Sequence, residues 1–151
     1  MLVPLLTNKD ISLIVRGRLY SSCVRSSMLH RSDTWPARKE NEVAELRTVR
    51  WMCGVKLQNR VPSKELRERL RLDDIISVLQ QNRLRWYGHA LGKEDNDWVK
   101  KCMEYEVEGA RPRGRRMKTW REIVEKDCQA RKLNREHAMD RIKWMKQIRD
   151  D

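Results

Sequence analysis

The chain has 151 residues, of which 37% are charged and 39% hydrophobic, and its 34 lysines and arginines against 22 aspartates and glutamates give a formal charge of +12. That length suits one domain of ordinary size or two small helical units, and the positive charge favours a polyanionic partner, nucleic acid first. No segment approaches the roughly 20 apolar residues that a membrane span requires, and the opening MLVPLL is too short for a signal-peptide core, so we expect no membrane partner and an intracellular protein, nuclear or cytoplasmic, that is not secreted.

The first third of the chain predicts two helices. Apolar residues recur at helical spacing over residues 11–29, which is typical of one face of an amphipathic helix. The positions expected on this face include Val15, Leu19, Cys23 and Met28. Pro36 ends any helix before it, because its ring disfavours α geometry at the preceding residue. A second helix is expected over residues 39–53, with Gly54 as its C-terminal cap.

The middle of the chain predicts two further helices. NRVPS, at residues 59–63, is a loop, and Ser63 can cap a short helix that ends at Leu70. Asp73 or Asp74 can cap the next helix, which Gly92 closes. The apolar stripe expected along that helix consists of Ile75, Leu79, Trp86 and Ala90.

The last third predicts shorter helices on either side of a basic loop. A short helix is expected to begin at Trp98 and to end before Gly109. ARPRGRRMK, at residues 110–118, has no acidic residue and no apolar periodicity, so it predicts a loop. Thr119 and Glu122 have the spacing of a capping box at the start of the next helix. The final helix is expected to begin near Asn134 and to use Ala138, Ile142, Met145 and Ile148.

Together these patterns predict an all-α protein of about six or seven short helices. Glycine and proline are sparse, at six and four, which favours helices joined by short loops. No stretch shows the alternation typical of strands, and no internal repeat is evident.

The basic loop is the strongest functional signal. Its cations surround Pro112 and Gly114, and they are Arg111, Arg113, Arg115, Arg116 and Lys118. Guanidinium groups in such a loop suit a phosphate backbone, where each contact releases counterions. We expect nucleic-acid contact here. The alternatives are a solvated loop that keeps the protein soluble and a nuclear-import signal.

A second cluster, NRLRWYGH at residues 82–89, is expected to combine core and contact. Trp86 lies on the apolar stripe, which favours core over a base-stacking platform. Arg83 and Arg85 point to different sides of the helix, and at least one is expected to reach a phosphate. His89 is expected to be a hydrogen-bonded structural residue, because no second histidine or carboxylate lies at helical spacing to orient it.

The sequence offers no catalytic constellation, and we expect no cofactor or metal site. Asp73 and Asp74 resemble a metal-binding pair, but the helix that follows needs a cap, which is the preferred interpretation. The cysteines form no CxxC pair and lie far apart, at positions 23, 53, 102 and 128. Reduced thiols are therefore preferred over a zinc site, which only tertiary convergence with histidines would create.

Five segments in order resemble the C-terminal part of reverse transcriptases from non-LTR (LINE-type) retrotransposons, and they cover nearly the whole chain. They are GRLYSSCVRSSMLHRSDTW (17–35), LRTVRWMCGVKLQNRVPSKELRERL (46–70), NRLRWYGHALGKEDNDWVKKCM (82–103), EGARPRGRRMKTW (108–120) and AMDRIKW (138–144). No single segment is decisive, but five in the family's order and with similar spacings are highly specific.

The resemblance implies a fragment of an RNA-directed DNA polymerase. Family members carry an endonuclease, then fingers and palm, then a helical thumb and a basic tail. This chain resembles thumb and tail, with a thumb-like helical region at residues 1–60 and a basic helical region at residues 61–151 that contains the Arg-rich loop 111–118. The palm aspartates of the family have no counterpart, so no polymerase activity is expected of this chain alone. In the family a tyrosine and a glycine are more common where His30 and Arg31 stand, which suggests drift.

We therefore expect a protein that binds RNA or DNA through backbone phosphates. An alternative is a helical protein-interaction module, whose apolar faces, with Trp35 and Trp51, once packed on the missing palm and now need a protein partner or self-association. A further alternative is a non-functional remnant of a transposable element.

Overall fold

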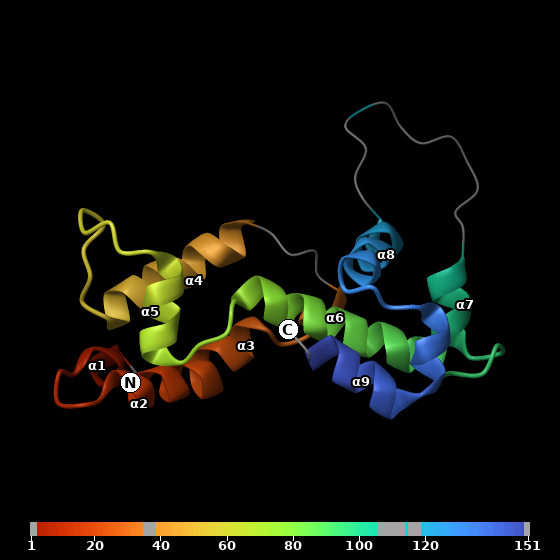
Figure 1. The fold of residues 1–151 in the computed structure, drawn as a ribbon, viewed down its shortest axis with the longest axis horizontal. Helices are drawn as coiled ribbons and strands as arrows, with labels where there is room; N and C mark the ends of the chain where they lie inside the picture. The colour runs from red at the N-terminus through yellow and green to blue at the C-terminus, as the bar shows by residue number, and fades with distance from the viewer. Residues whose placement is uncertain (1–2, 35–38, 106–113, 115–118, 150–151) are drawn as a thin grey trace. The chain divides into compact units, whose positions relative to one another are not determined.

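The computed structural model describes residues 3–34, 39–105, 114 and 119–149, with only the backbone of Thr34 and Lys39. Over these residues the fold is all-α, with no strand, which confirms the predicted fold class (Figure 1). Among the described residues no helix is long and apolar enough to cross a membrane.

The chain divides into two compact units. Unit 1 comprises Met1–Ser32 and Ala37–Leu79, and unit 2 comprises Asp33–Pro36 and Gln80–Asp151. The expected boundary at residues 60 and 61 therefore differs from the division observed, which falls inside a helix. The reason is that Leu66 and Leu70 belong to the core of unit 1.

The elements of unit 1 are short helices. Tyr20 and Ser26 both have α-helical backbone angles, so the second, third and fourth elements run as one continuous helix. In chain order the elements are α1 (Val3–Thr7), α2 (Leu13–Leu19), the π-helical η1 (Tyr20–Arg25), α3 (Ser26–Met28), α4 (Lys39–Met52) and α5 (Ser63–Leu70), followed by the first turn of α6 (Ile75–Leu91).

The core of unit 1 forms where α2 meets α5 at a glycine. A Cβ on Gly17 would lie 2.0 Å from the carbonyl oxygen of Leu70, so only glycine permits this approach. The buried face consists of Leu6, Tyr20, Val49, Met52, Leu66, Leu70 and Leu72. The predicted face of the first long helix is therefore partly wrong, since Val15 is 44% exposed and Cys23 is exposed. Gly17 is the residue of α2 that comes closest to α5. Because glycine has no side chain, a buried face predicted from apolar side chains does not include it.

A buried ion pair also lies in unit 1. Arg25 Nε lies 3.0 Å from Glu45 Oε1, with both side chains at most 5% exposed, and Arg25 donates to the carbonyl oxygen of Asp73. Burial raises the pKa of the Glu45 carboxyl above its ordinary value, and the Arg25 guanidinium opposes that rise. The pair joins η1 to α4 inside the unit.

Local capping signals in unit 1 are largely confirmed. Gly54 has φ +65, and its N–H donates to the carbonyl oxygen of Trp51 at 3.1 Å, which closes α4 as predicted. Asp74 caps α6 by accepting from the N–H of Ser77 at 3.2 Å. Ser63 does not cap α5, because it is the first helical residue and Pro62 stands at the N-cap without a side-chain bond.

Unit 2 is built on α6 and the helices that follow it. These are the remainder of α6, α7 (Trp98–Glu104), α8 (Trp120–Ala130), the 3-10 helix η3 (Arg135–Met139) and α9 (Arg141–Arg149), with the short 3-10 helix η2 (Ser32–Thr34) spanning the junction of the units. Its core consists of Leu84, Tyr87, Leu91, Val124, Cys128, Leu133, Ala138, Trp144 and Ile148. The Thr119 hydroxyl accepts from the N–H of Glu122 at 3.3 Å, which confirms the predicted N-cap of α8.

The final helix differs from its prediction. Asp140 interrupts the segment, since its Oδ1 accepts from the N–H groups of Ile142 at 3.0 Å and Lys143 at 3.1 Å and so starts α9 anew. This shifts the helical face, leaving Ile142 83% exposed and Trp144 only 2% exposed. Trp144 Nε1 donates to the carbonyl oxygen of Leu84 at 3.0 Å, which fastens α9 to α6.

Candidate nucleic-acid interface

The predicted basic loop falls outside the described residues. Arg111, Arg113, Arg115, Arg116 and Lys118 all lie there. In the sequence these residues lie between α7 (Trp98–Glu104) and α8 (Trp120–Ala130). Contact of this loop with phosphate stays a prediction.

Arg83 does not occupy the position that a phosphate contact requires, which corrects the prediction for this residue. Its side chain is 1% exposed, and Nε and Nη2 both donate to Asp127 Oδ2, at 2.8 and 2.6 Å. Gln80 Nε2 donates to the other carboxylate oxygen at 3.3 Å. A buried guanidinium that is already paired has no face left for a polyanion, so Arg83 is a structural residue that links α6 to α8.

Arg85 lies on the other side of the same helix and remains a candidate contact. It is exposed, and its Nη2 donates to Asn82 Oδ1 at 2.9 Å. Because Asn82 is neutral, the arginine keeps its full charge. Within the described part of the chain Arg85 forms no ion pair, which leaves it open to a phosphate.

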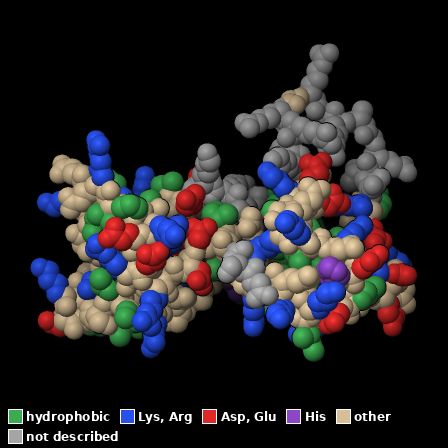
Figure 2. Space-filling model, in the orientation of Figure 1, with side chains coloured by type: hydrophobic (Ala, Val, Ile, Leu, Met, Phe, Trp, Pro, Cys, Tyr) green, Lys and Arg blue, Asp and Glu red, His purple; other side chains and the backbone are tan. Residues whose placement is uncertain are grey.

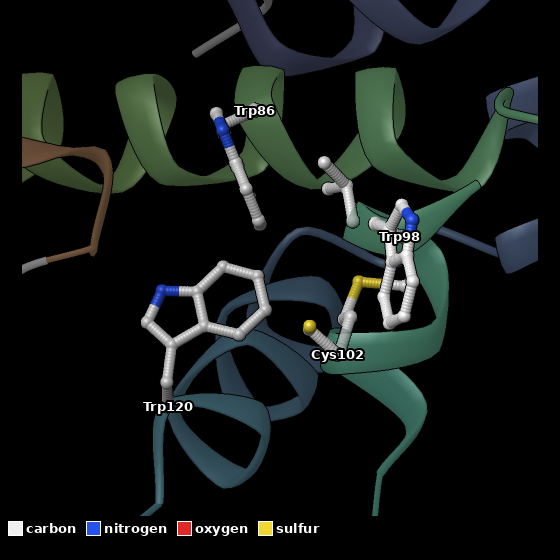
Figure 3. A pocket seen from close by; sticks show the side chains of 6 residues that line it. Trp86, Trp98, Cys102 and Trp120 are labelled. Carbon is white, nitrogen blue, oxygen red and sulfur yellow. The ribbon is translucent and has the colours of Figure 1, made fainter.

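An apolar pocket, which the sequence did not predict, opens between α6, α7 and α8. Its volume is about 410 Å³, and it is lined by Trp86, Trp98, Val99, Cys102, Met103 and Trp120. Figure 3 shows Trp86 on α6 and Trp120 on α8, with Trp98 and Cys102 on α7 across from them. The rings of Trp86 and Trp120 meet edge to face with centroids 5.1 Å apart. Trp86 is half-buried. It lines an open pocket rather than a closed core.

Trp98 is the most accessible ring of the pocket. It is 79% exposed, and Lys101 Nζ lies 5.7 Å from its ring centroid, a distance suited to a cation–π contact. Trp120 is more firmly held, because its Nε1 donates to the carbonyl oxygen of Asp33 at 3.2 Å. The pocket thus has one fixed wall and one exposed wall.

Three cations of unit 2 form ion pairs with carboxylates. The ion pairs are Lys93–Asp97 at 3.2 Å, Lys100–Asp95 at 2.5 Å and Arg121–Glu125 at 3.2 Å. The hydrogen bond from Lys100 lowers the pKa of Asp95. On the face drawn in Figure 2, lysine and arginine side chains are likewise interspersed with aspartate and glutamate. A polyanion would therefore favour the cations that have no such neighbour.

The titratable groups form no reactive centre in the described ranges. No group of three or more His, Cys, Asp or Glu side chains in those ranges is placed to hold a metal ion. His89 is exposed. Burial raises the pKa of the Cys128 thiol to about 11, with the Asp127 charge adding to the shift, so this thiol stays protonated near neutral pH.

Comparison of the chain with protein-family models, with curated proteins and with solved structures finds no match. The resemblance to reverse transcriptases rests on the five sequence segments alone.

Proposed function

We propose that this chain binds RNA or DNA through backbone phosphates and that its residues form a thumb-and-tail region like that of LINE-type reverse transcriptases. The observation that carries the proposal is the segment at residues 111–118, in which five cations occur without an acidic residue. Arg85, exposed and without an ion pair in the described chain, supports it.

The mechanism is electrostatic positioning. Each cation that contacts a phosphate displaces a condensed counterion, so binding weakens as salt rises, by about 0.9 in the log–log slope per contact on duplex DNA and about 0.7 on single strands. Because guanidinium groups donate two parallel hydrogen bonds, the arginines fix the backbone without reading bases. In an intact parent enzyme such an element would hold template RNA or target DNA against the polymerase.

The test is a salt series with two variants of equal charge. Binding to structured RNA, single strands and duplex DNA is measured for the wild type and for the loop variant, in which Arg111, Arg113, Arg115 and Arg116 become alanine. The control replaces four exposed cations of unit 1 by alanine, namely Lys9, Lys56, Arg60 and Lys64.

We expect the loop variant to lose about three to four units of slope, and the control to lose far less. If both variants lose the same amount, binding reflects diffuse charge and the loop assignment is wrong. If the wild type binds none of the probes at near-physiological salt, the proposed function is wrong.

A helical protein-interaction module is the second candidate, and the pocket lined by Trp86, Trp98 and Trp120 favours it. Apolar association persists at high salt, whereas phosphate binding fades. A complex or self-association that is retained at high salt, and is lost when Trp98 becomes alanine, would favour this candidate over nucleic-acid binding.

A further inference from the structure

Helix α9 carries a row of cations on its exposed side. Its sequence RIKWMKQIR has no acidic residue. Lys143, Lys146 and Arg149, defined here as the α9 row, follow one another at three-residue spacing and are all exposed. Residues three apart are neighbours on a helix surface, and six residues rise about 9 Å, so the row can span two or three successive phosphates.

The opposite side of α9 is anchored in the core. Trp144 and Ile148 are each 2% exposed, and a Cβ on Gly88 would lie 2.3 Å from Trp144 Nε1, so the indole lies directly on the backbone of α6. In Figure 1 α9 runs beside the later turns of α6. The row is therefore held on a fixed element rather than on a loop.

Both ends of α9 are also capped. Asp140 accepts from the first free N–H groups, and Arg131 Nη1 donates to the carbonyl oxygen of Ile148 at 2.6 Å. Capped ends limit fraying. The three side chains of the row thus start from a preformed helix, and binding need not order their backbone.

The charges of the row are available. None of its three cations forms an ion pair within the described residues, unlike Lys93, Lys100 and Arg121 elsewhere in unit 2. Two aspartates, 150 and 151, follow in the sequence and lie outside the described residues. A nearby polyanion would supply a counter-charge that the described residues do not supply.

We propose that the α9 row is a second phosphate-binding element, separate from the basic loop, which contacts the sugar–phosphate backbone of RNA or DNA. This inference rests on the proposed function. An anionic membrane is a poorer fit, because Ile142 is the one large apolar side chain exposed on described α9, and interfacial helices need a broad apolar face.

The experiment uses the full chain and compares two triple variants. Lys143→Ala/Lys146→Ala/Arg149→Ala removes the row, and Lys56→Ala/Arg60→Ala/Lys64→Ala removes the same charge from exposed positions in unit 1. Salt-dependent binding to RNA and to duplex DNA is measured for each. A third variant, Lys143→Arg/Lys146→Arg, keeps the charge, and circular dichroism compares the helix content of all three.

We expect the row variant to lose about two to three units of slope, the unit 1 variant to lose far less, and the charge-keeping variant to bind like the wild type. Wild-type binding with equal slopes for both triple variants would overturn this inference and leave the proposed function standing. If the wild type binds neither RNA nor duplex DNA, both this inference and the proposed function are wrong. Binding of the wild type to vesicles of phosphatidylserine, with no binding to nucleic acid, would identify the row as a membrane element and overturn it as well.

Discussion

Arg83 and Asp127 form a buried ion pair in which two nitrogens of one guanidinium donate to a single carboxylate oxygen, at 2.8 and 2.6 Å. The two residues are 44 positions apart and join α6 to α8. The pair therefore couples the helix that carries Arg85 to the helix that follows the basic loop.

Removing one partner of this pair should destabilise unit 2 strongly. Arg83→Met leaves the Asp127 carboxylate buried without its counter-charge, and we expect a loss of about 3–5 kcal/mol in the free energy of unfolding, measured by urea denaturation. The double variant Arg83→Met/Asp127→Leu removes both charges and should recover much of that loss. A loss below about 1 kcal/mol for Arg83→Met alone would show that the pair does not hold the helices together.

Arg85→Ala, unlike Arg83→Met, should weaken nucleic-acid binding and leave the stability of the chain nearly unchanged. The side chain is exposed, so the free energy of unfolding should change by less than about 0.5 kcal/mol. The slope of nucleic-acid binding against salt should fall by about 0.7–0.9, the value of one phosphate contact. Arg47→Ala, an exposed arginine on α4, is the matched control and should leave the slope nearly unchanged. Equal slopes for the two variants would remove Arg85 from the interface.

Two glycines near the end of α6 should respond differently to alanine. A Cβ at Gly88 would lie 2.3 Å from Trp144 Nε1, whereas at Gly92 the nearest atom is 3.6 Å away. Gly88→Ala should displace Trp144 and destabilise the chain by about 1–3 kcal/mol, while Gly92→Ala should stay within about 0.5 kcal/mol. Thermal denaturation, with tryptophan fluorescence as the probe, compares them. Similar stabilities would mean that α9 does not pack on α6 at Gly88.

Tyr20 should make unit 1 sensitive to alkaline pH. Burial raises its pKa from 10.0 to about 12, with the Glu45 charge adding to the rise. Between these values the folded phenol keeps a proton that the unfolded one releases, so the free energy of unfolding falls as pH rises, by at most about 3 kcal/mol. Tyr20→Phe should show a shallower decline over this window in urea titrations. Parallel declines for both proteins would contradict the assignment.

Local signals in the sequence predicted most of the helices. The positive φ of Gly54, the cap at Asp74 and the cap at Thr119 are each decided by a few neighbouring residues. A residue's own type and its near neighbours are enough to specify such features. The all-α class follows from the same local signals.

Tertiary partners account for what the sequence alone did not predict. Arg83 has a structural role because it pairs with Asp127 on another helix. The spacing of the two residues in the sequence does not indicate this contact. The close contact of α2 with α5 at Gly17 was not predicted, because glycine contributes no side chain to an apolar pattern. The pocket of Trp86, Trp98 and Trp120 requires three helices to converge. A helical wheel for α9, begun at Asp140 as a cap, would have shown the exposed lysines.

Phosphate binding by the basic segment is tested most directly by the salt dependence of RNA and duplex DNA binding. The full chain is compared with the loop variant, in which Arg111, Arg113, Arg115 and Arg116 become alanine. We expect a steep fall in affinity with salt for the wild type and a slope shallower by about three to four units for the variant. Superimposable salt curves, or no binding by the wild type at near-physiological salt, would contradict this expectation.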